Sequence, residues 1–228
     1  MDNRSTSRSN RTGMVTIDVL YFTSEDERVK HLSQIDPRLH RLMKKINSIK
    51  IPLKQDYYQS IVKQIVGQQL SLKAAHTINT QLEYVWPNLQ PELLDSLNDD
   101  QIRSSGVSRP KIRYIRELTQ KHLTKEVDFS HIHTLEDAEV VSILTNIKGI
   151  GKWTAEMFLI FTLGRLNVLS YGDVSIQNSI RWLYELDKDE SLNLDYFYEK
   201  WTPYNSIVSL YLWEAINSGM VKSPPPKP

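Results

Sequence analysis

Two glycines separated by one residue, Gly149 and Gly151, lie between two helical apolar patterns, so the turn that joins the helices is a short hairpin. Glycine carries no Cβ and reaches positive φ without strain, which lets a large anion approach the backbone closely. The N–H groups and the positive dipole end of the following helix bind phosphate oxygens. The spacing predicts a hairpin that binds the phosphate backbone of a nucleic acid and does not read the base sequence.

This hairpin does not match the phosphate-binding loop of nucleotide hydrolases. That loop requires Ser or Thr directly after its Gly-Lys pair, whereas Gly151-Lys152 is followed by Trp153, and Asn146 occupies the place of the first glycine. We expect the hairpin to contact phosphates through Lys148, Gly149, Ile150, Gly151, Lys152 and Thr154.

A carboxylate, Asp173, ends the short loop 169–173 (LSYGD) and begins another helical pattern. Aspartate at this place commonly caps the helix, by accepting hydrogen bonds from its first N–H groups. The helix dipole also favours the ionised carboxylate, which could stabilise a positive charge on a substrate. Both roles are compatible with the pattern.

Hairpin, helix, glycine-containing loop and aspartate occur here in the order found in the helix-hairpin-helix (HhH-GPD) DNA glycosylases. Residues 65–75 (IVGQQLSLKAA) resemble the upstream signature of the 3-methyladenine DNA glycosylase II branch, which removes alkylated purines. Residues 201–204 (WTPY), leading to Leu212-Trp213, resemble its C-terminal pocket helix. The resemblance covers roughly residues 53–219.

The resemblance implies the role of each candidate site residue. Asp173 corresponds to the family's catalytic aspartate. Trp153, Trp213 and Tyr204 correspond to aromatic residues of the base pocket, and Met157 stands where some relatives carry an aromatic ring. Gln69 occupies the place of the side chain that fills the DNA stack when a base is flipped out, with Leu70 as the alternative wedge.

Trp153 also stands where members of the superfamily that cut the DNA backbone carry a lysine nucleophile. Lys152 lies one position earlier, so its side chain leaves the helix in a direction rotated by about 100°. The chain has no cysteine, which excludes disulfides, zinc–thiolate sites and iron–sulfur clusters. We therefore expect a monofunctional hydrolase that leaves an intact abasic site.

Glycosidic cleavage usually requires two carboxylates, and the sequence offers one well-placed candidate. A purine alkylated at N3 or N7 is already cationic and leaves without a protonating acid. We expect the hydrolysis of alkylated purines such as 3-methyladenine and 7-methylguanine in duplex DNA. The alternatives are a glycosylase for oxidised or deaminated bases, and a helix-hairpin-helix protein that binds duplex DNA without chemistry.

No cofactor is required by this chemistry. The resemblance allows a weakly held monovalent or divalent ion on hairpin carbonyls near Gly149 and Gly151. His131 and His133 lack further ligands at metal spacing, so we interpret them as a surface loop and predict no metal site.

The positions of the apolar residues follow the helical period nearly everywhere, and residues 15–22 are the only strand candidate. The fold class is all-α, with two helical subdomains and a cleft between them. We expect subdomains at 58–163, which contains the hairpin, and at 14–57 plus 164–222. Residues 1–13 and 223–228 are expected to be disordered.

The formal net charge is only +1, from 28 basic and 27 acidic residues, but residues 101–125 carry seven bases and one acid, Glu117. This segment is either a phosphate-binding face or an ordinary solvated helix flank. No apolar run is long enough to span a membrane, and the first thirteen residues lack a signal-peptide pattern. We expect an intracellular monomer, in a prokaryotic cytoplasm or a eukaryotic nucleus.

Overall fold

The computed structural model of the chain describes residues 18–54, 56–187 and 189–227, so the expected disordered segment 1–13 lies outside the described residues. The chain divides into two compact units. Unit 1 combines residues 1–55 with 164–228, and unit 2 consists of residues 56–163.

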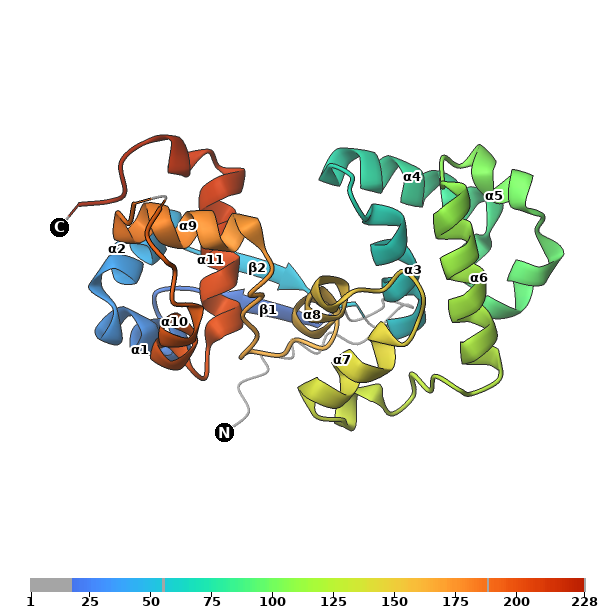
Figure 1. Ribbon diagram of the computed structural model, residues 1–228, viewed down its shortest axis with the longest axis horizontal. Coiled ribbons are helices and arrows are strands. Elements are labelled where there is room, and N and C mark those ends of the chain that lie inside the picture. The colour runs from blue at the N-terminus through green and yellow to red at the C-terminus, as the bar shows by residue number, and fades with distance from the viewer. Residues whose placement is uncertain (1–17, 55, 188, 228) are drawn as a thin grey trace, which may run out of the picture. The chain divides into compact units, whose positions relative to one another are not determined.

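Both units are built mainly from helices (Figure 1). Unit 1 contains β1 (Val19–Phe22), α1 (Glu27–Ile35), α2 (Pro37–Ile46), β2 (Ile49–Pro52), α9 (Val174–Tyr184), α10 (Leu194–Trp201), α11 (Asn205–Asn217) and the 3-10 helix η4 (Met220–Lys222). Unit 2 contains α3 (Tyr57–Gly67), α4 (Leu72–Val85), η1 (Pro87–Leu89), η2 (Pro91–Ser96), α5 (Asp99–Ser104), α6 (Arg109–Leu123), η3 (Ile132–Thr134), α7 (Asp137–Thr145) and α8 (Lys152–Phe161).

The expected all-α fold class is confirmed, and a two-stranded sheet is its one departure among the described residues. β1 falls within the strand candidate 15–22 and pairs antiparallel with β2, with Leu20 opposite Ile51. The sequence did not reveal β2, because a four-residue segment ending in proline is too short to show an alternating pattern.

The core of unit 1 surrounds α11, whose residues 205–212 are all buried. α9 and α2 pack against it. A buried carboxylate, Asp36, caps α2 and accepts hydrogen bonds from the N–H groups of Arg38 and Leu39, both at 3.1 Å. It also binds side chains from two other helices, namely Trp201 Nε1 at 3.0 Å, Lys200 Nζ at 2.9 Å and the Tyr184 hydroxyl.

Unit 2 packs α3 against α4, α6 and α8. The apolar stripe of α3, comprising Ile61, Val62, Ile65 and Val66, is buried as its spacing predicts. Ser71 caps α4 by accepting a hydrogen bond from Ala74 N at 3.3 Å, as serine directly before a helix commonly does.

The C-terminal segment of unit 1 differs from the expectation of a disordered tail. Arg41 Nε donates to the Pro226 carbonyl at 2.9 Å, and Trp182 Nε1 donates to the Ser223 carbonyl at 2.7 Å. These hydrogen bonds attach residues 223–226 to α2 and α9. None of the helices in the described ranges has the length and apolar character that crossing a bilayer requires.

Candidate functional site

Asp173 is the N-cap of α9 and is largely buried, with 7% of its surface exposed. Its Oδ1 accepts hydrogen bonds from the backbone N–H groups of Ser175 at 2.7 Å and Ile176 at 3.1 Å. The capping role considered from the sequence is therefore confirmed. Because one carboxylate oxygen is used for the cap, the chemistry available to the second oxygen, Oδ2, is set by its other neighbours.

Trp213 is one of those neighbours. Its Nε1–H on α11 donates to Asp173 Oδ2 at 3.2 Å, and its ring is half-buried. Two helices thus fix the carboxylate, α9 through its N-terminal backbone and α11 through the indole. A carboxylate held by donors on both oxygens is fixed in one orientation before a substrate binds.

Tyr204 is not brought to this carboxylate. It precedes the first turn of α11, about 13 Å along the helix axis from Trp213 at 1.5 Å rise per residue. Its ring stands edge-on to that of His31 on α1, with centroids 5.7 Å apart. Trp201, which belongs to the same motif, is fully buried on Asp36.

In unit 2, α7 and α8 are joined by the predicted hairpin (Figure 1). Gly149 has φ +88°, and a Cβ on it would lie 2.1 Å from Cδ2 of Tyr114, so the turn requires glycine there. Gly151 has φ −90° and ψ 171°, which any residue adopts. In the described part of the chain, no heavy atom beyond its two chain neighbours lies within 4 Å of the place that a Cβ would take. Packing does not explain why Gly151 is a glycine.

The remaining hairpin residues divide by exposure. Lys148 and Lys152 are exposed, and Lys152 Nζ lies 3.8 Å from Glu156 Oε1 on the same helix. Ile150 and Thr154 are buried, so their side chains belong to the core of unit 2 and only their backbone groups remain for a phosphate contact. The residue before α8 is Gly151, so its first turn has no side-chain cap.

Trp153 and Met157 lie one turn apart on α8 and hence on one side of the helix. Trp153 is 46% exposed, whereas Met157 is buried. An exposed indole in the first turn of a helix can stack on a planar ligand. Met157, one turn further along α8, is buried and offers no such face.

Gln69 and Leu70, the wedge candidates, form the exposed turn between α3 and α4. Gln69 has φ +57°, a left-handed conformation that is uncommon for a side chain other than glycine, asparagine or aspartate. Leu70 is 38% exposed and Leu72, the first residue of α4, is 82% exposed. The geometry leaves both wedge candidates open.

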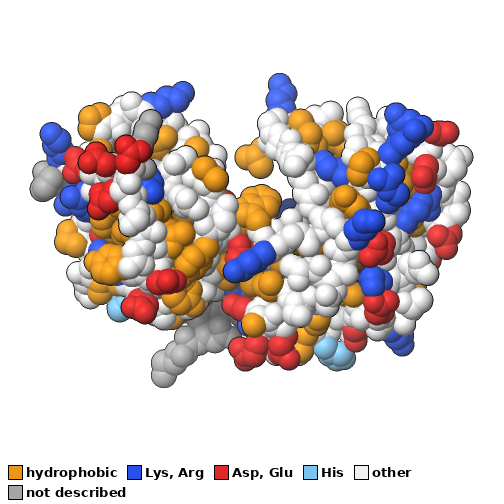
Figure 2. Space-filling view, in the orientation of Figure 1, with side chains coloured by type: hydrophobic (Ala, Val, Ile, Leu, Met, Phe, Trp, Pro, Cys, Tyr) orange, Lys and Arg blue, Asp and Glu red, His pale blue; other side chains and the backbone are white. Residues whose placement is uncertain are grey.

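The basic segment 101–125 corresponds to α5, α6 and the turn after it, and Figure 2 shows Lys and Arg side chains gathered over this part of unit 2. Three of its seven bases are engaged within the unit. Arg116 binds Asp99 and the Leu97 carbonyl, Lys121 pairs with Glu126, and Lys111 binds backbone carbonyls. The exposed face is therefore less basic than the sequence indicates.

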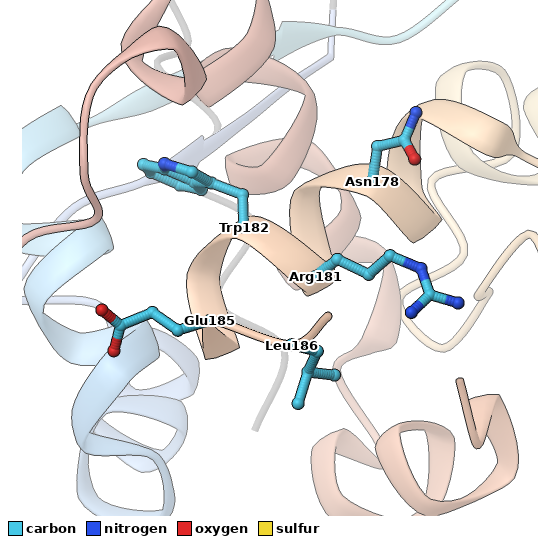
Figure 3. Close-up of a pocket in the computed structure, with 5 residues that line it drawn as sticks. All are labelled: Asn178, Arg181, Trp182, Glu185 and Leu186. Carbon is cyan, nitrogen blue, oxygen red and sulfur yellow. The ribbon is translucent and has the colours of Figure 1, made fainter. Parts of the chain in front are cut away.

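A hollow of about 610 Å³ lies on α9, the helix that Asp173 begins (Figure 3). Its lining residues are Asn178, Arg181, Trp182, Glu185 and Leu186. Arg181 and Trp182 point in opposite directions, and none of the predicted site residues contributes to it. We assign it no part in the site.

Among the described residues, no group of three or more His, Asp or Glu side chains is arranged to hold a metal ion. His131 and His133 are exposed. The Gly149 carbonyl, one of those considered for a hairpin ion, accepts a hydrogen bond from Gln68 Nε2 at 2.8 Å. A carbonyl oxygen carries two lone pairs, and this hydrogen bond occupies one of them.

Comparison with known proteins matches this arrangement to one family. Residues 62–203 match the model of the HhH-GPD superfamily base excision DNA repair proteins. A Bacillus subtilis protein provisionally named a DNA-3-methyladenine glycosylase is 32% identical over 179 residues, which span 72% of this chain and 61% of that protein.

Two solved structures are similar as well. The crystal structure of a DNA-3-methyladenine glycosidase from Bacillus halodurans is 38% identical, with a TM-score of 0.77 over 88% of this chain and 94% of that one. The Schizosaccharomyces pombe 3-methyladenine DNA glycosylase in complex with abasic DNA is 28% identical, with a TM-score of 0.76 over 84% and 97%. The chain belongs to the HhH-GPD superfamily of base excision DNA repair proteins.

Proposed function

We propose that this protein is a DNA glycosylase that hydrolyses the N-glycosidic bond of alkylated purines in duplex DNA and leaves an abasic site. The observation that carries the proposal is the Asp173 carboxylate, held by the first N–H groups of α9 and by the Trp213 indole. Similarity to proteins named as 3-methyladenine glycosylases supports the same activity.

The chemistry needs one fixed negative charge. In an N3- or N7-alkylated purine the base is cationic, so the bond from C1′ to nitrogen breaks with both electrons going to the base, which departs neutral. Positive charge develops on the sugar, and Asp173 stabilises it. A water oxygen then bonds to C1′ and releases a proton to solvent.

Other residues bind and expose the substrate. Exposed Trp153 and half-buried Trp213 offer faces on which a cationic purine stacks, each worth about 1–3 kcal/mol. Gln69 or Leu70 fills the stack that the flipped base vacates. Since no packing demand explains Gly151, we assign its bare backbone to close approach by a DNA phosphate.

Three further properties follow from the proposal. With Trp153 in place of a lysine nucleophile, the enzyme forms no Schiff base and does not nick the strand. The reaction needs no cofactor. We also propose that the protein acts as a monomer inside the cell, where its DNA substrate lies.

The test incubates the purified full chain with duplex DNA that has been methylated on its purines. Chromatography of the released bases and strand cleavage with and without alkali give the two readouts. We expect free 3-methyladenine or 7-methylguanine, and strand breaks only after alkali. A parallel incubation uses duplexes that contain single hypoxanthine or oxidised purines.

Each rival predicts a different outcome. Release of a neutral lesion as fast as that of the methylated purines favours a glycosylase for deaminated or oxidised bases. Tight duplex binding without any base release favours a binding protein. Strand nicking without alkali contradicts the monofunctional mechanism.

A further inference from the structure

The turn that holds the wedge candidates, residues 68–71, leaves the C-terminus of α3, where backbone carbonyls have lost their helical partners. Two weak backbone hydrogen bonds hold it from within, Gln68 N to Ile65 O at 3.4 Å and Leu70 N to Gly67 O at 3.2 Å. With Gln69 at φ +57°, this turn requires support from outside to keep one conformation.

Lys111 of α6 supplies that support. Its Nζ donates to the Val66 carbonyl at 2.8 Å and to the Gln68 carbonyl at 2.7 Å, which bracket the end of α3. A cation is favoured at this end of a helix by the dipole. Burial lowers the pKa of the Lys111 ammonium, as expected for a lysine turned toward the protein and not toward solvent.

The same turn is tied to the hairpin by Gln68. Its Nε2 donates to the Gly149 carbonyl at 2.8 Å and to Thr154 Oγ1 at 3.3 Å. The residue next to the wedge candidate Gln69 therefore touches both the hairpin and the first turn of α8. Two loops far apart in the sequence are joined by one side chain.

α6 holds the hairpin as well. The Tyr114 ring packs on Gly149, and a Glu117 carboxylate oxygen accepts a hydrogen bond from Lys148 N at 3.2 Å. Lys111, Tyr114 and Glu117 are spaced by three, so they follow one side of the helix. This stripe of α6 supports the wedge turn at one end and the hairpin at the other.

We propose that Lys111 is a positioning residue for base removal: it fixes residues 68–71 so that the wedge enters the DNA stack in register with the hairpin. The inference rests on the proposed function, since the wedge has meaning only for a base-flipping enzyme. It gives a lysine of the basic segment a role that involves no phosphate.

The first test needs no DNA. Hydrogen–deuterium exchange at the amides of residues 68–71 is compared in the wild type, Lys111→Met and Arg113→Met. Arg113 is exposed on the same helix, so its substitution removes an equal charge without touching the turn. We expect exchange at least about tenfold faster in Lys111→Met alone. Equal exchange in all three proteins overturns the positioning role, whatever the function is.

The second test uses a duplex with a tetrahydrofuran abasic analogue beside a 2-aminopurine, whose fluorescence reports a side chain entering the stack. With protein at saturation, we expect Lys111→Met to lose most of the wild-type signal. We also expect it to release bases from methylated DNA about tenfold more slowly. Its salt dependence of binding should equal that of the wild type, because Lys111 neutralises no phosphate.

The contrary result is equally defined. A salt slope lower by about one unit, with an unchanged 2-aminopurine signal, makes Lys111 an ordinary phosphate contact and overturns the proposal. If Lys111→Met does not fold, Lys111→Gln replaces it, since a shorter, uncharged side chain cannot keep both carbonyl contacts. A full 2-aminopurine signal in Lys111→Gln also overturns the proposal.

Failure of the proposed glycosylase function gives a different set of results from failure of the Lys111 proposal. If the wild type releases no base and neither Gln69→Ala nor Leu70→Ala changes the 2-aminopurine signal, the proposed function fails while the exchange result still stands.

Discussion

The two hairpin glycines provide a sharp prediction, because they are alike in sequence and opposite in environment. At Gly149 the backbone has φ +88° and the Tyr114 ring occupies the Cβ position. At Gly151 the backbone is extended and the Cβ position is open in the described part of the chain. Gly149→Ala should damage the fold, and Gly151→Ala should damage DNA binding.

The magnitudes follow from these environments. Alanine at position 149 costs about 1–2 kcal/mol for the left-handed backbone and about 1–3 kcal/mol for displacing the ring. Alanine at position 151 is a poorer N-cap than glycine, but it lowers the entropy of the unfolded chain. These effects offset each other, and we expect a stability change within about 1 kcal/mol.

For DNA, a methyl group on Gly151 separates the backbone from a phosphate. The loss of a hydrogen bond to a charged group costs about 1.5–3 kcal/mol, which is a ten- to hundredfold loss of affinity. Urea unfolding followed by tryptophan fluorescence measures stability, and anisotropy of a labelled duplex at fixed salt measures affinity. Wild-type affinity in Gly151→Ala, or wild-type stability in Gly149→Ala, would refute this reasoning.

Three further substitutions test other contacts. Trp213→Phe keeps an aromatic ring but removes the hydrogen-bond donor to Asp173 Oδ2. We expect the free energy of unfolding to fall by about 1 kcal/mol and single-turnover base release to slow. An unchanged rate would contradict the role of Trp213 in orienting the carboxylate. Burial opposes ionisation of Asp36, but hydrogen bonds from Trp201, Tyr184 and Lys200 outweigh burial and lower the pKa of this carboxyl. The ionised carboxylate therefore stabilises the fold at pH values above its unfolded pKa of about 3.9. This contribution is lost as the pH falls through the lower pKa of the folded state. Asp36→Asn should therefore flatten the acid limb of a urea-midpoint profile between about pH 2 and 5, and an unaltered limb would disprove it. Arg116→Met should lower stability by about 1–2 kcal/mol and leave the salt slope of DNA binding unchanged, because Arg116 binds Asp99 and the Leu97 carbonyl; a shallower slope would place it on DNA.

Much of the fold is readable from the sequence because helices are local. The stripe at 61–66, the cap at Ser71 and the helix ending at Asn217 all follow from spacing and residue type. β2 is not readable, since a short strand is defined by its partner across the sheet and not by its own four residues.

In the site as well, local features are predictable from the sequence and contacts between distant segments are not. The order of motifs identifies Asp173, and its helix cap is predictable from residue type alone. Its bond to Trp213 joins two helices distant in sequence, so no local pattern carries it. Membership of one motif does not place Tyr204 beside Trp213, because the two residues lie about 13 Å apart along the axis of α11.

Side-chain charge alone was a poor guide to role in the basic segment. Lys111 and Arg116 have the residue type of phosphate ligands, yet both bind carbonyls within unit 2. Nothing in the sequence distinguishes a lysine that faces solvent from one that faces a helix end. The Asp36 cluster was missed for the same reason, since its donors come from α9 and α10.

Asp173→Asn tests the central chemistry most directly, because asparagine caps a helix as well as aspartate and the substitution removes chiefly the charge. Asp56→Asn, at the N-cap of α3, is the matched control. The measurement is the single-turnover rate of base release from methylated duplex DNA at saturating protein. We predict a loss of about 10²–10³ in Asp173→Asn, with duplex affinity retained and the control unaffected. A rate within about twofold of the wild type would contradict the assignment of Asp173 as the charge that stabilises the departing sugar.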